Sequence, residues 1–242
     1  MDTTVVEVDP GVYELAVQHF KLPRNFTPQL RDAKEYVEDA KRSGAQFDYI
    51  VHDVFTGGVE PVDLFTLEFM RGLHDILADD GAISIVSPSY TCPTDRKSIM
   101  HQLTSPQTKN YAGDLSFPLA GQVFRTILSV FPSCRIFRES EGKSDMYEGD
   151  FTNTVVFCKK SAAPLKFRQP VKGDFLGTKS RETYLFPKWE VDSAVFEQTG
   201  EETQSLLEAG KLSQLQSWQV KGALGHWEIM RNVIPAVYWE NW

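Results

Sequence analysis

Short apolar runs alternate with amphipathic helices along residues 3–159, and this alternation restricts the fold more than any other feature of the chain. Such alternation is typical of an α/β protein whose parallel sheet is covered on both faces. The last two strands have no helix between them, which predicts an antiparallel final strand. The expected strands are 3–9, 29–31, 47–53, 82–85, 134–138 and 154–159, and the expected helices are 10–20, 33–41, 64–77 and 120–130.

The remaining residues, 161–242, have a different pattern. The stretch 161–192 contains proline and glycine with little periodicity, and a further helix is expected over 201–218 before a tryptophan-rich end. We therefore predict an incomplete Rossmann-like domain over residues 1–160 and a C-terminal extension, residues 161–242, packed on it.

Charge and composition exclude several partners. The chain has 242 residues and a formal net charge of −8, which opposes binding to nucleic acid or to an anionic membrane surface. It has no run of ~20 apolar residues and no signal peptide at its start. Its three cysteines are widely spaced, so neither a structural disulfide nor a metal site is expected. These features indicate a cytoplasmic domain without a metal.

Three acids stand at or just after the carboxyl ends of expected strands, where open parallel sheets bind their ligands. Glu7 is suited to bonding ribose hydroxyls, and Asp32 with Ala33 is suited to an adenine-side contact. Asp53 follows the strand nearest the expected reaction centre, where a carboxylate would accept a proton from an attacking amine. For the run that begins at Glu7 and for Asp32, simple helix capping is an equal alternative.

Several segments together resemble the spermidine-synthase-like proteins of fungi, within the class I S-adenosylmethionine-dependent methyltransferase superfamily. They are Val6–Pro10, Asp32–Ala33, Phe47–Phe55, Asn110–Leu115 and Gly225–Trp242. The resemblance implies a transferase of polyamine biosynthesis that moves an aminopropyl group from decarboxylated S-adenosylmethionine to a small-molecule amine. It also implies Asp53 as the catalytic proton acceptor and the possibility of a homodimer.

The chain departs from that group at its cofactor loop. No two glycines are spaced as Gly-x-Gly, and only six residues precede Glu7. A strand, glycine turn and helix need at least ~20 residues, so we expect a class I sheet that lacks its first strand and glycine loop. An N-terminal truncation explains this pattern, and we predict little or no catalysis from residues 1–242 alone.

Two further departures bear on function. No second acid follows Asp53 at the spacing that binds a diamine in spermidine synthases, since Glu60 and Asp63 are the nearest. Residues 86–109 form an insertion, either a translated intron or a loop at the mouth of the site. The alternatives to aminopropyl transfer are an S-adenosylmethionine-dependent methyltransferase and a non-catalytic binding derivative.

Overall fold

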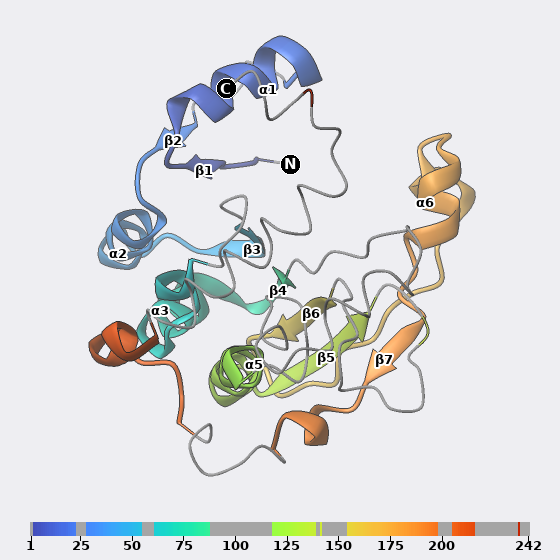
Figure 1. Ribbon diagram of the computed structural model, residues 1–242. Helices are drawn as coiled ribbons and strands as arrows, with labels where there is room; N and C mark the ends of the chain where they lie inside the picture. Colours follow the sequence, from blue (N-terminus) through green and yellow to red (C-terminus); the bar gives the residue numbers. More distant parts are fainter. Residues whose placement is uncertain are drawn as a thin grey trace.

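A computed structural model of the chain describes residues 2–22, 28–54, 61–87, 118–138, 141, 154–197, 205–215 and 237 (Figure 1). The strands are β1 (Val6–Glu7), β2 (Gln29–Leu30), β3 (Phe47–Asp53), β4 (Leu77–Ser87), β5 (Ser133–Arg138), β6 (Thr154–Lys159) and β7 (Trp189–Val191). The α-helices are α1 (Pro10–Phe20), α2 (Ala33–Ser43), α3 (Leu67–Ile76), α5 (Pro118–Val130) and α6 (Lys179–Tyr184). The described residues also include the 3-10 helices η1 (Val62–Phe65), η2 (Lys172–Phe175), η3 (Ser193–Glu197) and η5 (Ala209–Leu215).

Within the described ranges, the main sheet has five strands in the order β3-β4-β6-β5-β7. β3 and β4 are parallel, and β6 is antiparallel to both β4 and β5. β3, β4 and β5 therefore run in one direction, while β6 and the edge strand β7 run in the other. This arrangement confirms the predicted α/β sheet with an antiparallel last strand.

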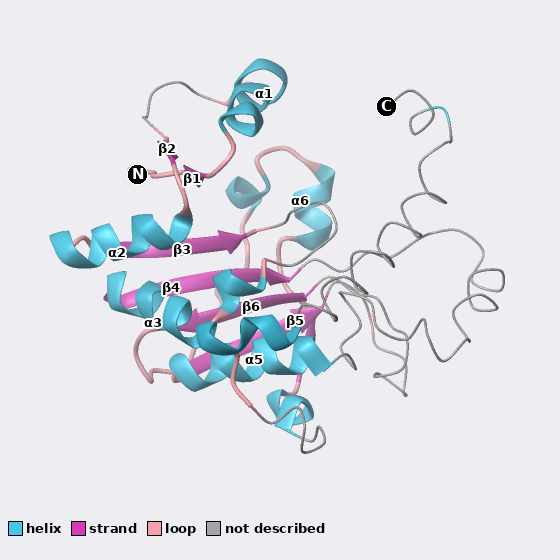
Figure 2. Cartoon of the chain, turned by 60° about the vertical axis from the view of Figure 1, so that its left-hand side comes forward, coloured by secondary structure: helices cyan, strands magenta, loops and turns pink. Residues whose placement is uncertain are grey.

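The core lies between the sheet and a layer formed by α2, α3 and α5, which Figure 2 shows in front of the strands. Large apolar side chains such as Phe65, Phe124 and Ile85 are fully buried there. α2 and α3 approach each other closely at Gly72, where an added Cβ would lie 2.7 Å from Val37 Cγ1. Packing at this point therefore requires glycine.

A second, two-stranded sheet pairs β1 with β2 in parallel. α1 follows β1 and lies on the side of the sheets opposite α2, α3 and α5 (Figure 1). None of its residues is buried. Within the described part of the chain, β1 pairs only with β2, and β3 pairs only with β4.

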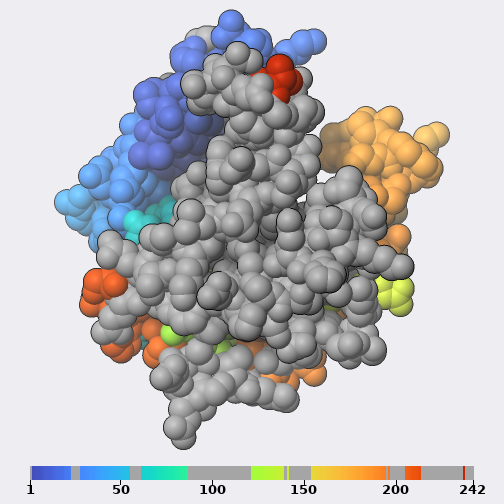
Figure 3. All heavy atoms as spheres, in the orientation of Figure 1, coloured from blue at the N-terminus to red at the C-terminus, as the bar shows by residue number. Residues whose placement is uncertain are grey.

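The C-terminal part contributes β7 to the edge of the main sheet. Arg135 of β5 donates two hydrogen bonds, of 2.7 and 2.6 Å, to the carboxylate of Glu190 in β7. The Arg135 guanidinium also lies 5.0 Å from the ring centroids of both Phe137 and Phe167. Just before β7 in the chain, α6 projects at the upper right of the space-filling view (Figure 3).

Two expectations about local structure are wrong. Cys134 and Cys158 form a disulfide, because the antiparallel register of β5 and β6 places them directly opposite each other with Cα atoms 4.1 Å apart. The α-helix expected over 201–218 is absent from residues 205–208, and 209–215 form a 3-10 helix. The backbone of Leu207 forms hydrogen bonds to distant residues instead of helical ones: Leu207 N donates to Thr126 Oγ1, and Leu67 N donates to Leu207 O.

Other sequence-based expectations lie partly outside the described residues. Of the insertion 86–109, only Val86 and Ser87 are described, and they end β4. All helices among the described residues are too short or too polar to cross a membrane. The same residues contain no group of three or more His, Cys, Asp or Glu side chains placed to hold a metal ion.

Candidate functional site

The three predicted acids stand at the carboxyl ends of three strands. Glu7 ends β1, Asp53 ends β3, and Asp32 follows β2 by two residues and begins α2. β1 and β2 are parallel, and α2 returns the chain from β2 to the start of β3. The three acids therefore lie along one edge of the fold, where ligands of open α/β sheets bind.

A groove between β1 and β3 reaches this edge. Its cavity volume is about 190 Å³, and its lining includes Val6 of β1, Ala33 of α2, and Asp53 and Val54 at the end of β3. The structure thus brings Ala33 and Asp53 together in one groove. Glu7 follows the lining residue Val6, and Asp32 precedes the lining residue Ala33, but neither acid lines the groove itself.

Glu7 and Asp32 also have local structural contacts. Glu7 Oε1 accepts a 2.8 Å hydrogen bond from the backbone of Asp9, and Asp9 caps α1 by accepting one of 2.7 Å from Gly11 N. Asp32 caps α2 by accepting a 2.7 Å hydrogen bond from Lys34 N. The capping interpretation is therefore confirmed for Asp32. In the run that begins at Glu7, the residue that caps α1 is Asp9. In these backbone contacts, Glu7 and Asp32 each use only one of their two carboxylate oxygens.

Lys34 is a site neighbour that the sequence analysis did not single out. Its ammonium group donates a 2.6 Å hydrogen bond to Asp63, just before α3, and lies 3.8 Å from Asp32. The hydrogen bond to Asp63 and the two negative charges raise the pKa of Lys34. The lysine thus links the start of α2 to the 3-10 helix η1. In the sequence, the only signal for this role is its position two residues after an N-cap acid.

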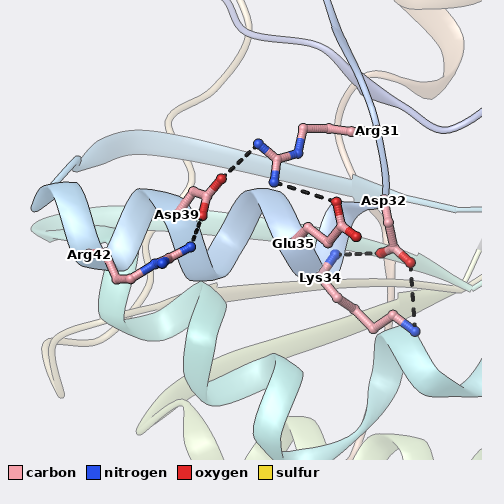
Figure 4. Close-up of polar contacts among 6 residues, drawn as sticks. All are labelled: Arg31, Asp32, Lys34, Glu35, Asp39 and Arg42. Atoms are coloured by element: carbon pink, nitrogen blue, oxygen red, sulfur yellow. Dashed lines mark hydrogen bonds and ion pairs between the residues drawn. The ribbon is translucent and has the colours of Figure 1, made fainter.

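A second ion-pair network runs along the outer face of α2 (Figure 4). Arg31 contacts Asp39 at 2.7 Å and Glu35 at 3.6 Å, and Arg42 also bonds Asp39. Hydrogen bonds from Arg31 and then Arg42 lower the pKa of Asp39. Asp32 takes no part in this network, and its carboxylate contacts Lys34 instead (Figure 4).

His52 belongs to the core. It is buried, its Nε2 lies 3.1 Å from Leu64 O, and its ring packs edge-on against Phe65 with centroids 4.8 Å apart. Burial lowers its pKa to about 4. The expectation that His52 has a packing role is confirmed.

Substitutions of Asp32 can separate its cap from a ligand contact. Asp32→Ala should reduce the free energy of unfolding by about 1 kcal/mol, because Lys34 N loses its acceptor. Asp32→Ser should keep the stability, since serine is an equally good N-cap, while removing the carboxylate. Urea unfolding measures the stability of both variants, and Glu38→Ala, at an exposed residue of the same helix, is the control. Equal losses for the serine and alanine variants would contradict the capping role.

The strand order, the crossover helices and the acids at the strand ends define a class I S-adenosylmethionine-dependent methyltransferase fold. A solved structure of a probable spermidine synthase from Corynebacterium glutamicum matches with a TM-score of 0.52 over 85% of this chain and 63% of that chain. At 18% identity this match shows the fold alone. No protein-family model matches the chain.

Among curated proteins, an N-terminal histidine N-methyltransferase from Emericella nidulans is 44% identical over 100% of this chain. The chain spans 40% of that relative's length. A polyamine aminopropyltransferase from Vibrio vulnificus is 30% identical, over only 33% of this chain and 27% of its own length.

The expectation of aminopropyl transfer in polyamine biosynthesis is therefore wrong. The match to the methyltransferase covers the whole chain at higher identity, whereas the match to the aminopropyltransferase covers a third of it. The sequence misled because both groups share the scaffold on which Asp53 and the other strand-end acids lie. The missing second acid after Asp53 was the signal that pointed away from a diamine acceptor.

Proposed function

We propose that this chain is the S-adenosylmethionine-dependent domain of an N-methyltransferase whose acceptor is the imidazole ring of an N-terminal histidine. The observation that carries the proposal is the 44% identity over the full chain to the Emericella nidulans N-terminal histidine N-methyltransferase. The class I fold and the strand-end acids are consistent with it.

The strand-end residues have the donor and acceptor chemistry that S-adenosylmethionine needs. Glu7 would accept hydrogen bonds from the ribose hydroxyls, and Asp32 would accept one from the adenine amine beside Ala33. Each of these carboxylates uses one oxygen in the backbone contacts described above, and the other oxygen of Asp32 lies 3.8 Å from Lys34 Nζ. When bound, the co-substrate supplies a methyl group made electrophilic by its sulfonium.

Asp53 is suited to act on the acceptor. Its side chain is exposed at the end of β3, inside the groove that also contains Ala33. A carboxylate there would accept a hydrogen bond from one ring N–H of the imidazole and orient the other nitrogen, whose lone pair forms the new N–C bond. After the S–C bond breaks with its electrons on sulfur, Asp53 would take the ring proton, leaving a neutral methylated imidazole.

The test uses the native protein isolated from its source cells. It is incubated with S-adenosylmethionine and a synthetic peptide that begins with histidine, and fragment masses are used to locate any added methyl group. We expect one methyl group on the imidazole of the first residue. The same peptide with an internal histidine only is the control and should stay unmodified.

A second incubation replaces the co-substrate with its decarboxylated form and supplies putrescine. We expect no methylthioadenosine above background from this mixture. An unmodified histidine peptide in the first incubation, with the protein intact and folded, would contradict the proposal.

A further inference from the structure

Asp53, the proposed proton acceptor, belongs to a row of directly paired residues that crosses the main sheet. Strand pairing places Asp53 opposite Val86 of β4 and Val86 opposite Val155 of β6. Val155 in turn pairs with Phe137 of β5. Val156, the next residue of β6, belongs to the core under the helices, so the row lies on the other face of the sheet, away from α2, α3 and α5.

A cavity lies where this cross-strand row reaches β5. Its volume is about 190 Å³, and the row members Phe137 and Val155 line it together with the segment from α6 to β7. Figures 1 and 2 show α6 on the side of the sheet away from α3 and α5. Pockets for small molecules usually have about 300–1,000 Å³, so this β5 cavity suits a single side chain better. Its aromatic lining favours an apolar one, and consists of Phe137, Phe157, Tyr184, Phe186 and Trp189.

A basic groove adjoins the β5 cavity. It has a volume of about 580 Å³, shares residues 185–187 with the cavity, and is lined by Lys166, Arg168 and Arg181. Its one acid among the described lining residues is Asp174, which accepts hydrogen bonds of 2.6 and 2.7 Å from Arg168. The charge of Asp174 is thus held by Arg168, and the exposed Lys166 and Arg181 leave the groove positive.

The segment that forms this surface is positive as a whole. Residues 161–188 contain six lysines and arginines and two acids, a net charge of +4 in a chain whose net charge is −8. A surface of this sign attracts acidic groups. The charge of the whole chain opposes nucleic acid, whereas a short acidic peptide contacts the positive segment alone. The apolar cavity beside the groove also suits a peptide, which offers apolar side chains between its charges.

We propose that the β5 cavity and the basic groove bind the acceptor polypeptide beyond its first residue and select an apolar side chain followed by acids. The cross-strand row spans three strand spacings of about 4.8 Å, so Phe137 lies about 14 Å from Asp53. An extended peptide covers that distance with about four residues. With the histidine at Asp53, the apolar side chain stands near the fifth position of the acceptor, and the acids follow it. The identity of this occupant rests on the proposed function.

The experiment measures, by fluorescence anisotropy and without co-substrate, how labelled histidine-first peptides bind the native protein. The parent peptide has phenylalanine in its fifth position followed by acids, with glycine and serine elsewhere. A second peptide has lysines in place of the acids, and a third has serine in place of phenylalanine. We expect the lysine peptide to bind at least tenfold more weakly than the parent peptide, and added salt to reduce that difference.

Charge reversal at exposed lysines locates the basic surface. The double variant Lys166→Glu, Lys188→Glu, made in the native protein, should bind the acidic peptide about tenfold more weakly and the lysine peptide more tightly. Lys172→Glu is the matched control, because Lys172 is an exposed lysine of the same segment that lines neither the cavity nor the groove. Its effect should be about twofold at most.

Tyr184→Ser tests the β5 cavity. Tyr184 lines the cavity and is 71% exposed, so this substitution should leave the fold intact. The parent protein should bind the phenylalanine peptide at least fivefold more tightly than the serine peptide. In the Tyr184→Ser protein that preference should fall to about twofold, because the two changes remove the same contact.

Four results would overturn the inference. They are equal binding of the acidic and lysine peptides, equal effects of Lys172→Glu and the double variant, an unchanged phenylalanine preference in Tyr184→Ser, and displacement of the labelled peptide by a DNA duplex. The last would assign the positive surface to nucleic acid.

Methylation of the same peptides separates this inference from the proposed function. If all three peptides are methylated with equal kcat/KM and bind equally well, the inference fails and the proposed function stands. If the binding preferences are found but the histidine stays unmodified, the surface is confirmed as a peptide site and the proposed function fails.

Discussion

In the native protein, replacing Asp53 by asparagine is expected to lower kcat/KM for methylation of an N-terminal histidine by about 100-fold, the lower end of the range for a lost proton acceptor. The amide keeps the shape of the side chain but cannot take the imidazole proton. Asp53 is exposed at the end of β3, so the substitution should leave the fold intact. Initial rates with a histidine-first peptide measure the effect, and a thermal melt verifies folding.

Asp48 provides the matched control for this substitution. It is also an exposed aspartate of β3, but it lies near the start of the strand, at the end remote from Asp53. Asp48→Asn removes the same charge from the same strand and should retain the parent rate. If Asp53→Asn retained that rate as well, the proton-acceptor role would be wrong. If both variants lost activity equally, the effect would be one of net charge.

The sequence predicted those elements whose pattern is local. The helix 10–20 and the strands 47–53 and 154–159 have the expected bounds, because each has its own periodicity and its own end signal. Pro10 opens the helix after the Asp9 cap, and the Asp32 cap opens α2 at the expected residue. Placing the acids at the strand ends also followed from local pattern, since a parallel sheet brings the carboxyl ends of its strands to one edge.

Features set by contacts between distant residues could not be predicted in the same way. The disulfide depends on the register of β5 against β6, and cysteine spacing contains no information about that register. The extended backbone around Leu207 depends on hydrogen bonds to Thr126 and Leu67. β7 has only three residues, and its place in the sheet depends on pairing with β5. Tertiary contacts override propensity in each case.

The reaction could be predicted from the sequence less well than the fold. An acid at the end of β3 suits a proton acceptor in either aminopropyl or methyl transfer, so Asp53 does not distinguish the two chemistries. What distinguishes them is the group that binds the acceptor, and the residues directly after Val54 lie outside the described ranges. Similarity over the full chain, and not the acid pattern, therefore favours methyl transfer over aminopropyl transfer.

Acidification is expected to destabilise the chain through His52 before most carboxylates titrate. Burial lowers the pKa of His52 from 6.5 to about 4, so the unfolded chain binds a proton between these values that the folded chain does not. Stability contributed by the neutral ring is therefore present above pH 6.5 and is lost as the pH falls toward 4. The loss should be about 2 kcal/mol between pH 7 and pH 5, and about 3 kcal/mol by pH 4.

Urea unfolding of His52→Leu against the parent chain tests this expectation. Leucine keeps an apolar contact with Phe65 and Phe69 but does not titrate, so its unfolding free energy should change little between pH 7 and pH 5. His19→Leu, at an exposed histidine of α1, should keep the parent's pH dependence. Parallel curves for the parent and His52→Leu would show that the ring accepts a proton in the folded state. In that case the packing of His52 against two phenylalanines would not prevent its protonation.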